Sequence, residues 1–518
     1  MGTAQRGHSA SIRRAALIAL LSLLIGATPA LATSSTVVVR REIRAGSGGS
    51  EAMNVSESTI MNGALFFSAT DGTHGYELWT SDGTESGTYL FKDINPGAAS
   101  SNPSRLEVVG GYLYFTANDG VHGIELWKSD GTVSGTTMVK DITTGSDSSS
   151  ISDFDVSWLA IGSTLFFTNN DATGSELWKT DGTAAGTMMV KDINETPFTG
   201  SNPTHAVVMG GYLYFNADDG VNGTELWRSD GTTAGTTLVA DIFDGGSSEP
   251  QSLAVVGSTL YFTAFNTCGR ELWKSDGTGV GTTRVKDINP AGECGEGASS
   301  NPSYLTPFGS SIIFRADDGE HGSELWKSDG TEGGTLLVKD LNADGSSSID
   351  DIVVLDGVAY FSANGGMAGG GYELWKSDGT EGGTTVVNDL NPGSNGSYPF
   401  NLYPYEGDLW YFAEPDGEGL YLYQYDPAED AVQQIPLPEV DDEVSCECQR
   451  TSILGGDRRI FFPLYGSATG GELGVLFLDG LPSTDREPSG WTTALALAAA
   501  LTAAAGVGLR LSRGTMRR

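Results

Sequence analysis

ELWKSDGT, at residues 271–278, is an eight-residue stretch that this chain repeats. Identical copies begin at Glu125, Glu324 and Glu373. Close variants begin at Glu77, Glu176 and Glu225, which makes seven motifs in all. The motif tryptophans are 46 to 53 residues apart and are Trp79, Trp127, Trp178, Trp227, Trp273, Trp326 and Trp375. A period of about fifty residues with strand-like content is typical of solenoids and propellers, whose units bury their apolar faces against neighbours.

One repeat unit, residues 105–142, contains four strand-like segments: RLEVVGG, YLYFTANDG, IELWKSDGT and GTTMVKDI. Each is rich in Val, Tyr, Phe, Trp or Thr and is bounded by Gly, Asp or Asn, which predicts antiparallel strands joined by tight turns. Aromatic residues occupy both alternating sets of positions, so both faces of each sheet are expected to be buried. The sequence therefore predicts an all-β fold, a single large β-propeller over residues 34–480.

The motif itself has a structural interpretation in such a fold. We expect the seven motif tryptophans to pack between blades, and the Ser-Asp-Gly-Thr turn to hold the hairpin backbone with its side chains. A ring needs the same contact between blades at every step, which explains why the motif recurs.

The number of blades depends on the two ends of the repeat region. Beyond residue 391 the motif decays, but an eighth unit is visible at 408–435 and a ninth at 452–477. The ninth unit lacks a fourth strand, and residues 36–43, TVVVRREI, match the pattern of the fourth strands. We predict about nine four-stranded blades, the last closed by this N-terminal strand, with eight blades as the alternative because propellers have about four to eight.

Both chain ends carry targeting features. Residues 1–32 combine arginines, an apolar run and a small-residue cleavage pattern, which predicts a secretory signal cut after Ala32. Residues 491–509 are apolar and long enough to span a membrane, and the basic residues 510–518 are expected to stay cytoplasmic. Residues 481–490 form a linker that contains REPSGW.

These motifs resemble two known classes of sequence. The seven repeats are similar to those of the bacterial ELWxxDGT repeat proteins over roughly residues 34–400. That resemblance implies an exported propeller and no settled activity. The tail resembles PEP-CTERM sorting signals, although REP stands where PEP is usual. This second resemblance implies removal of the helix after export, and a retained C-terminal anchor is the alternative.

The charge of the exported part limits its partners. Seven of the 29 basic residues lie in the signal and the tail, whereas none of the 66 acidic residues does. The remaining 22 basic residues face a threefold excess of acidic ones, which argues against nucleic acid and anionic lipid as partners. We expect a monomer at the cell surface, anchored or released, whose ligand is an extracellular glycan or protein.

Histidines and aspartates are the candidate catalytic or metal-binding groups of this chain. His74, His122 and His321 occupy the same place in DGxHG turns, so on different blades they are expected to lie apart, and His205 stands alone. Repeated turn acids offer oxygen ligands for calcium, and they are Asp71, Asp119, Asp171, Asp219 and Asp318. None of these loops has the spacing of a calcium loop, so we expect structural turns, with calcium as the alternative and no other cofactor.

Four cysteines allow three pairings in an exported protein. Cys268 lies in a hairpin loop of the fifth unit and Cys294 in the connection that leaves it. Both loops emerge on the same face of an antiparallel blade, which predicts a disulfide between them. Cys446 and Cys448 are too close in sequence for an easy bridge.

No catalytic constellation is recognisable in the sequence. The nucleophile, base and orienting group of a triad are not apparent, and with 66 acidic residues a pair of carboxylates identifies nothing. We expect a binding or structural scaffold. The alternative is a hydrolase or lyase acting on a polysaccharide, with its site in the irregular loops or the degenerate last units.

Overall fold

The computed structural model describes residues 37–41, 53–154, 158–290, 299–366, 370–393, 396–415, 419–435, 454–456, 459–466 and 470–478. These residues form strands β1 to β37 and no helix. Contacts divide the chain into two units, Met1–Val37 with Phe477–Arg518, and Val38–Leu476. The sheets belong to the second unit, apart from the end residues of β1 and β37.

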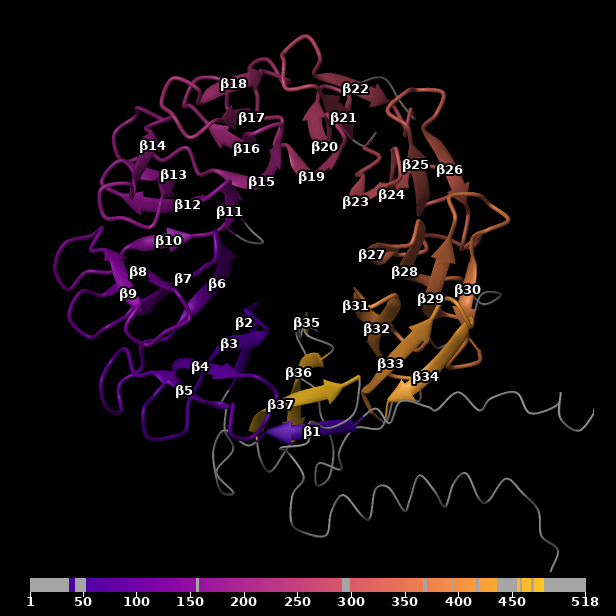
Figure 1. Ribbon diagram of the computed structural model, residues 1–518. Coiled ribbons are helices and arrows are strands. Elements are labelled where there is room, and N and C mark those ends of the chain that lie inside the picture. Colours follow the sequence, from indigo (N-terminus) through magenta and orange to yellow (C-terminus); the bar gives the residue numbers. More distant parts are fainter. Residues whose placement is uncertain are drawn as a thin grey trace, which may run out of the picture. The chain divides into compact units, whose positions relative to one another are not determined.

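Nine sheets follow one another along the chain (Figure 1). Sheet 1 consists of β2 (Met53–Met61), β3 (Ala64–Ala69), β4 (Glu77–Ser81) and β5 (Tyr89–Lys92). Sheet 2 consists of β6 (Ser104–Val109), β7 (Tyr112–Asn118), β8 (Ile124–Ser129) and β9 (Thr137–Lys140). Sheet 3 consists of β10 (Ser150–Ser152), β11 (Leu159–Ile161), β12 (Thr164–Asp171), β13 (Gly174–Thr180) and β14 (Met188–Lys191). Sheet 4 consists of β15 (Thr204–Met209), β16 (Tyr212–Asp218), β17 (Thr224–Ser229) and β18 (Thr237–Ala240).

The remaining five sheets have the same organisation. Sheet 5 consists of β19 (Gln251–Val256), β20 (Thr259–Asn266), β21 (Gly269–Ser275) and β22 (Thr283–Lys286). Sheet 6 consists of β23 (Ser303–Phe308), β24 (Ser311–Asp317), β25 (Ser323–Ser328) and β26 (Leu336–Lys339). Sheet 7 consists of β27 (Asp350–Leu355), β28 (Val358–Asn364), β29 (Tyr372–Ser377) and β30 (Thr385–Asn388). Sheet 8 consists of β31 (Phe400–Tyr405), β32 (Asp408–Ala413), β33 (Tyr421–Asp426) and β34 (Ala431–Ile435), and sheet 9 of β35 (Leu454–Gly456), β36 (Arg459–Gly466), β37 (Gly470–Phe477) and β1 (Val37–Arg41).

Tight turns explain where the first two strands of a sheet end. Asn62 and Gly63 join β2 to β3 with φ angles of 53° and 79°. Gly110 and Gly111 join β6 to β7 with φ angles of 59° and 83°. Two-residue hairpins need positive φ at both central residues to match the twist of the strands, so Asn and Gly are favoured there.

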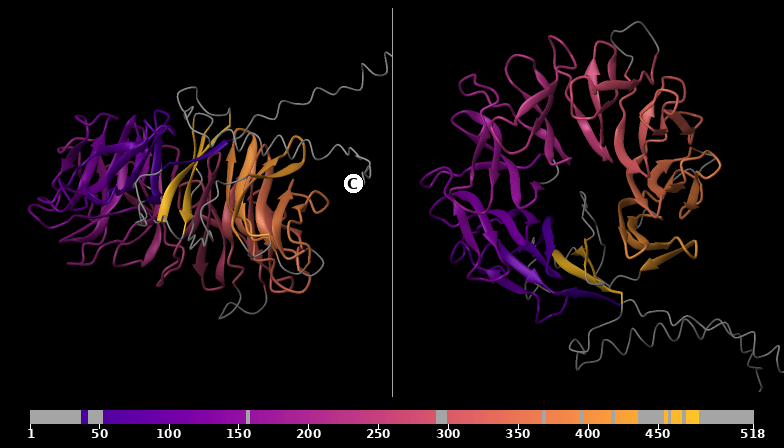
Figure 2. Two further views of the ribbon diagram at one scale, coloured as in Figure 1. Left: turned by 90° about the horizontal axis from the view of Figure 1, so that it is seen from below. Right: turned by 45° about the horizontal axis from the view of Figure 1, so that its top comes forward.

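The apolar core lies between successive sheets. Leu78 of sheet 1 shares a cluster with Phe115 and Trp127 of sheet 2, and all three are buried. Leu272 of sheet 5 shares one with Trp326 of sheet 6 in the same way. The first strands of successive sheets also contact each other, as β15, β19, β23, β27 and β31 do (Figures 1 and 2). Face-to-face packing that is closest at the first strands is β-propeller-like.

The predicted all-β fold with four antiparallel strands per unit is therefore confirmed at this level. Sheet 3 departs from the pattern because its first strand is divided into β10 and β11, which both pair with β12. Ser152 pairs with Thr168, and the next described pair is Leu159 with Phe166. The chain thus advances seven residues while its partner advances two, which reflects an insertion in this unit.

Several sequence predictions lie outside the described residues. They are the signal at 1–32, the linker at 481–490, the membrane helix at 491–509 and the tail at 510–518. In the parts of the chain that are described, no helix has the length and apolarity required to cross a membrane.

Candidate functional site

The glutamate that opens each motif is a clamp for the connection to the next sheet. Glu271 is fully buried and accepts hydrogen bonds from the backbone N–H of Ile288 (3.0 Å) and Ser300 (3.0 Å). The Ser300 hydroxyl donates a third bond at 2.6 Å. The six other motif glutamates are also fully buried and accept the serine N–H at the equivalent position, and they are Glu77, Glu125, Glu176, Glu225, Glu324 and Glu373.

The clamped serine in turn reaches the following sheet. The carbonyl oxygen of Ser300 accepts the N–H of Asp317 in sheet 6 at 2.9 Å. That of Ser397 accepts the N–H of Glu414, directly after β32 of sheet 8, at 2.7 Å. One buried carboxylate therefore fixes both the connection and the contact between sheets. Glutamate is a residue type used in acid–base catalysis, but the hydrogen bonds of this carboxylate hold the protein's own backbone in place.

Burial changes the protonation of these glutamates. Desolvation raises the pKa of Glu271, Glu324 and Glu373 to about 7, against the hydrogen bonds that favour the charged form. A raised carboxyl pKa is a common property of catalytic acids, but here the oxygens already have donors from the backbone. The same values therefore fit a structural network.

Four motif tryptophans, Trp178, Trp227, Trp326 and Trp375, lie in clusters between sheets, and each faces a lysine of the preceding sheet. Lys140 Nζ of sheet 2 lies 6.0 Å from the ring centroid of Trp178, and Lys286 Nζ of sheet 5 lies 5.8 Å from that of Trp326. These distances fit cation–π contacts. Trp79, Trp127, Trp178, Trp227, Trp273, Trp326 and Trp375 are all buried.

The DGT part of the motif forms a turn held by its own side chains. Asp276 Oδ1 accepts the backbone N–H of Thr278 at 2.9 Å and its hydroxyl at 2.7 Å. A Cβ atom at Gly281 would lie 2.0 Å from that carboxylate oxygen, so glycine is required at this close approach. The turn aspartate is thus a local cap.

The repeated DGxHG histidines are paired with their turn aspartates. His74 Nδ1 lies 2.8 Å from Asp71 Oδ2, and this hydrogen bond raises the pKa of His74. The pairs His122–Asp119 and His321–Asp318 have the same geometry, at 2.7 and 2.8 Å. Each histidine belongs to a different sheet, as the sequence suggested.

The turn acids considered as calcium ligands are engaged in their turns. Asp219 Oδ1 accepts the backbone N–H of Val221 and Asn222, and its Oδ2 accepts the Asn222 amide at 2.7 Å. Asp171 Oδ1 accepts the N–H and hydroxyl of Thr173. Within the described ranges, no three His, Cys, Asp or Glu side chains come together as a possible metal site.

Only one cysteine of the predicted disulfide, Cys268, lies among the described residues. Cys268 lies in the loop between β20 and β21, where its N–H donates to Asn266 Oδ1 at 2.8 Å. Cys294, Cys446 and Cys448 lie outside the described residues. The disulfide between Cys268 and Cys294 stays a prediction.

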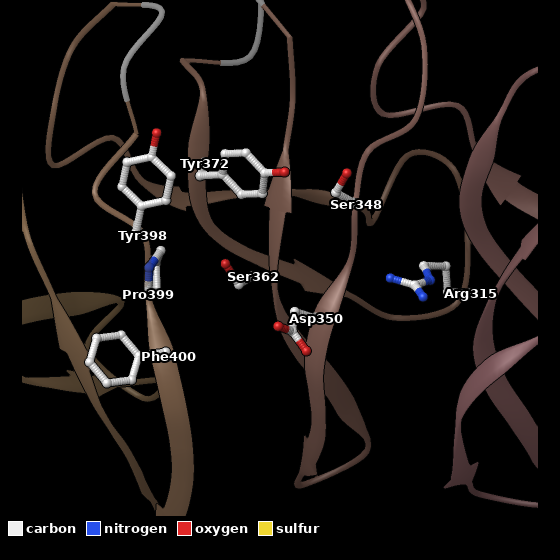
Figure 3. Close-up of a pocket in the computed structure, with 8 residues that line it drawn as sticks. All are labelled: Arg315, Ser348, Asp350, Ser362, Tyr372, Tyr398, Pro399 and Phe400. Carbon is white, nitrogen blue, oxygen red and sulfur yellow. The ribbon is translucent and has the colours of Figure 1, made fainter. Parts of the chain in front are cut away.

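A pocket of about 400 Å³ lies where sheets 6, 7 and 8 adjoin. Figure 3 shows its lining: Arg315, Ser348, Asp350, Ser362, Tyr372, Tyr398, Pro399 and Phe400. Aromatic side chains line one side, and Ser348, Asp350 and Arg315 lie across from Tyr398 and Phe400 (Figure 3). The volume lies within the range of small-molecule pockets, and the lining combines aromatic and polar side chains.

Two networks fix this pocket. The Tyr372 and Tyr398 rings are stacked, with centroids 5.2 Å apart and an interplanar angle of 21°. Arg315 Nη1 donates to the carbonyl oxygen of Ile349 at 2.8 Å, and its Nε donates to Ser303 Oγ at 3.0 Å. The pocket walls are therefore anchored to the connections between sheets.

Sequence reasoning missed these residues because they come from three different units. One signal was available, since the residue after the clamped serine varies between units. It is asparagine at Asn102, Asn202 and Asn301, serine at Ser150 and Ser348, glutamate at Glu249 and tyrosine at Tyr398. Among the seven motif units, Tyr398 is the aromatic residue at this position.

Comparison with known proteins assigns no family. No family model and no curated protein matches the chain. Among solved structures it is similar to a prolyl endopeptidase, at 12% identity and a TM-score of 0.39, over 71% of this chain and 55% of that one. It is also similar to a puromycin hydrolase, with 14% identity and a TM-score of 0.38, over 73% of this chain and 60% of that one. A Mycobacterium tuberculosis puromycin-hydrolyzing peptidase is similar with 13% identity and a TM-score of 0.36, over 72% of this chain and 60% of that one. The chain thus spans less than two thirds of each, and similarity at this level says nothing of its activity.

Proposed function

We propose that this chain is an exported, cell-surface-associated β-propeller that serves as a binding or structural scaffold for an extracellular ligand. The observation that carries the proposal is that the repeated polar side chains form hydrogen bonds within the fold. The motif glutamate holds a connection, the turn aspartate holds a hairpin, and the lysine reaches the next sheet, as Glu271, Asp276 and Lys274 do. The repeat therefore builds a framework, and binding is left to positions that differ between units.

We further propose that the propeller has nine blades and closes through its N-terminal strand. Support comes from sheet 9, in which β1 lies next to β37. Arg459 Nη1 of β36 donates to the carbonyl oxygen of Gly63, in the first turn of sheet 1. The ring centroids of Phe462 and of Phe412 in sheet 8 are 6.3 Å apart. Sheet 9 thus has contacts with the first and the eighth sheets.

The proposed location rests on the two chain ends. We propose that residues 1–32 are removed on export and that residues 491–509 anchor the protein unless the tail is processed near Pro488. The resemblance to exported ELWxxDGT repeat proteins supports this location. Intact-mass analysis of the exported protein distinguishes the anchored form from the processed form, and a cytoplasmic chain that retains residues 1–32 contradicts both.

A direct test compares binding with turnover. The purified chain is applied to glycan and polypeptide arrays, and the same preparation is screened for hydrolase and lyase activity on polysaccharides. The proposal predicts saturable binding to at least one array class and no release of products. Turnover of a polysaccharide without comparable binding supports the alternative enzyme and contradicts the scaffold.

A further inference from the structure

We infer that the pocket between sheets 6, 7 and 8 is a binding site for a neutral saccharide, with one sugar ring seated against Tyr372 and Tyr398. This inference rests on the proposed binding function and names its ligand class. Its first support is the rigidity of the tyrosine pair. The carbonyl oxygen of Tyr372 accepts the N–H of Ser397 at 2.8 Å and of Tyr398 at 3.2 Å.

The repeated clamp presents the exposed tyrosine. Buried Glu373 accepts the Ser397 N–H at 2.9 Å and the Ser397 hydroxyl at 2.5 Å. Tyr398 is the next residue. The Ser397 N–H is bound to Glu373 and the Tyr398 N–H to the carbonyl oxygen of Tyr372, so the backbone is held before and after the peptide bond that joins Ser397 to Tyr398. The Tyr398 ring is thereby held ready for a ligand, which reduces the ordering that binding requires.

Tyr398 is an unfavourable residue for its backbone conformation. Its φ is 49°, and the equivalent residues of other units have the same conformation, with φ angles of 43° at Asn301, 45° at Glu249 and 48° at Ser348. Asparagine tolerates this left-handed region, whereas a bulky side chain does so rarely. The ring is also 52% exposed, so burial in a core does not compensate for the strain. A ligand-binding role explains why this unit carries an aromatic side chain there.

The opposite wall provides hydrogen-bonding groups. Asp350 and Ser362 are direct partners in the register of β27 and β28, and both line the pocket (Figure 3). In sheet 2 the equivalent residues, Ser104 and Thr116, satisfy each other through a hydroxyl hydrogen bond of 2.7 Å. The carboxylate of Asp350 introduces a stronger acceptor at that place.

The shape and the chemistry together favour a sugar ring. One face of a pyranose presents C–H groups, which suit the electron-rich face of an aromatic ring, while its edge carries hydroxyls that need donors and acceptors. Figure 3 shows this division, with Tyr398 and Phe400 on one side and Asp350, Ser348 and Arg315 on the other. A pocket of about 400 Å³ accommodates such a ligand.

Charge favours a neutral saccharide over an acidic one. Asp350 lines the pocket, and acidic residues outnumber basic ones by 66 to 29 in the chain. The Arg315 guanidinium is held by the carbonyl oxygen of Ile349 and by Ser303, and it lies 5.0 Å from the Tyr304 ring centroid. Arg315 therefore holds the connection between sheets 6 and 7 in place, and its N–H groups form part of the pocket wall. A peptide ligand is the competing class.

The test uses the full chain and calorimetric titration with cellotetraose, xylotetraose, mannotetraose and chitotetraose. Wild type is compared with Tyr398→Asn, which suits the local backbone, and with Asp350→Asn, which keeps the side-chain shape. Tyr89→Asn is the matched control, because Tyr89 is 49% exposed and lies on β5 of sheet 1. Thermal unfolding is recorded for each variant to confirm that it is folded.

We expect at least one tetrasaccharide to bind, with affinity reduced at least tenfold by Tyr398→Asn and by Asp350→Asn and unchanged by Tyr89→Asn. Equal affinity in wild type and both pocket variants overturns the site. Failure of all four saccharides to bind overturns the saccharide class. In that case a polypeptide that binds on the array leaves the proposed scaffold function standing, whereas polysaccharide turnover without binding overturns both.

Discussion

Lys140 of sheet 2 donates a hydrogen bond from Nζ to the carbonyl oxygen of Thr187 in sheet 3, at 2.8 Å. The same bond links Lys191 to Thr236 and Lys286 to Thr335, each time from a fourth strand to the next sheet. The apolar clusters lie between the same sheets. The contact between neighbouring sheets is thus a repeated combination of one polar bond and one apolar cluster.

The first prediction concerns this lysine. Lys140→Met keeps most of the aliphatic stem but loses the hydrogen bond to Thr187 and the charge over Trp178. We expect the free energy of unfolding to fall by about 1–2 kcal/mol. Urea denaturation measures the change, with Lys140→Arg as the control that retains a cation. An unfolding free energy equal to that of wild type shows that the bond does not stabilise the sheet contact.

The second prediction concerns the buried clamp. Glu271→Ala leaves the N–H groups of Ile288 and Ser300 without their acceptor inside the protein. Each unsatisfied buried donor costs about 1–3 kcal/mol, so we expect a loss of about 3 kcal/mol or more. Glu332→Ala, at an exposed turn position, is the control and is expected to change little. A loss below about 1 kcal/mol for Glu271→Ala contradicts the structural role.

The third prediction concerns pH. Burial raises the pKa of Glu271, Glu324 and Glu373 to about 7, from 4.5. Between these values the native state binds protons that the unfolded state has released. The stabilisation is therefore complete below about pH 4.5 and is lost as the pH rises through about 7.

The three DGxHG histidines act in the same direction. Their aspartate partners raise the pKa of His74, His122 and His321, so their contribution is also lost as the pH rises. We expect a higher urea midpoint at pH 5 than at pH 8. The Glu→Gln triple variant at positions 271, 324 and 373 is expected to have a flatter pH dependence. A midpoint that rises from pH 5 to pH 8 contradicts this account.

The fourth prediction concerns closure. Removal of residues 36–43 from the mature chain deletes β1 and exposes an edge of β37. We expect a lower unfolding temperature and concentration-dependent association, because an unpaired strand edge can pair with another chain. Light scattering and thermal unfolding measure both effects. A deletion variant that remains as stable and as monomeric as the full mature chain contradicts closure through this strand.

The sequence predicted the sheets well because the relevant signals are local. Asn62–Gly63 is a hairpin turn by residue type alone, and the spacing of Trp273 and Trp326 reveals one unit. The clamp was not predicted, since Glu271 binds Ser300 across 29 residues and the connection must first fold back. The division of the first strand in sheet 3 was missed for a similar reason, because an insertion changes pairing without changing the motif.

The pocket is the feature that was hardest to predict from the sequence. Arg315 belongs to sheet 6, Asp350 and Tyr372 belong to sheet 7, and Tyr398 lies in the connection before β31 of sheet 8. These residues meet only when the three sheets pack in succession. Their chemistry becomes visible in the sequence only after the units are aligned on the clamped serine. Tyr398 then stands out as an aromatic residue, because the other motif units carry asparagine, serine or glutamate there, at Asn102, Ser150, Asn202, Glu249, Asn301 and Ser348.

The most direct test of the account is a single sample in which binding and chemistry are both measured. The full chain is equilibrated with an oligosaccharide identified by titration, the bound fraction is determined by dialysis, and the recovered saccharide is analysed by mass spectrometry. We predict saturable binding and recovery of the saccharide with its mass unchanged. Shortened or unsaturated products, formed by wild type and lost in Asp350→Asn, contradict the scaffold and establish an enzyme.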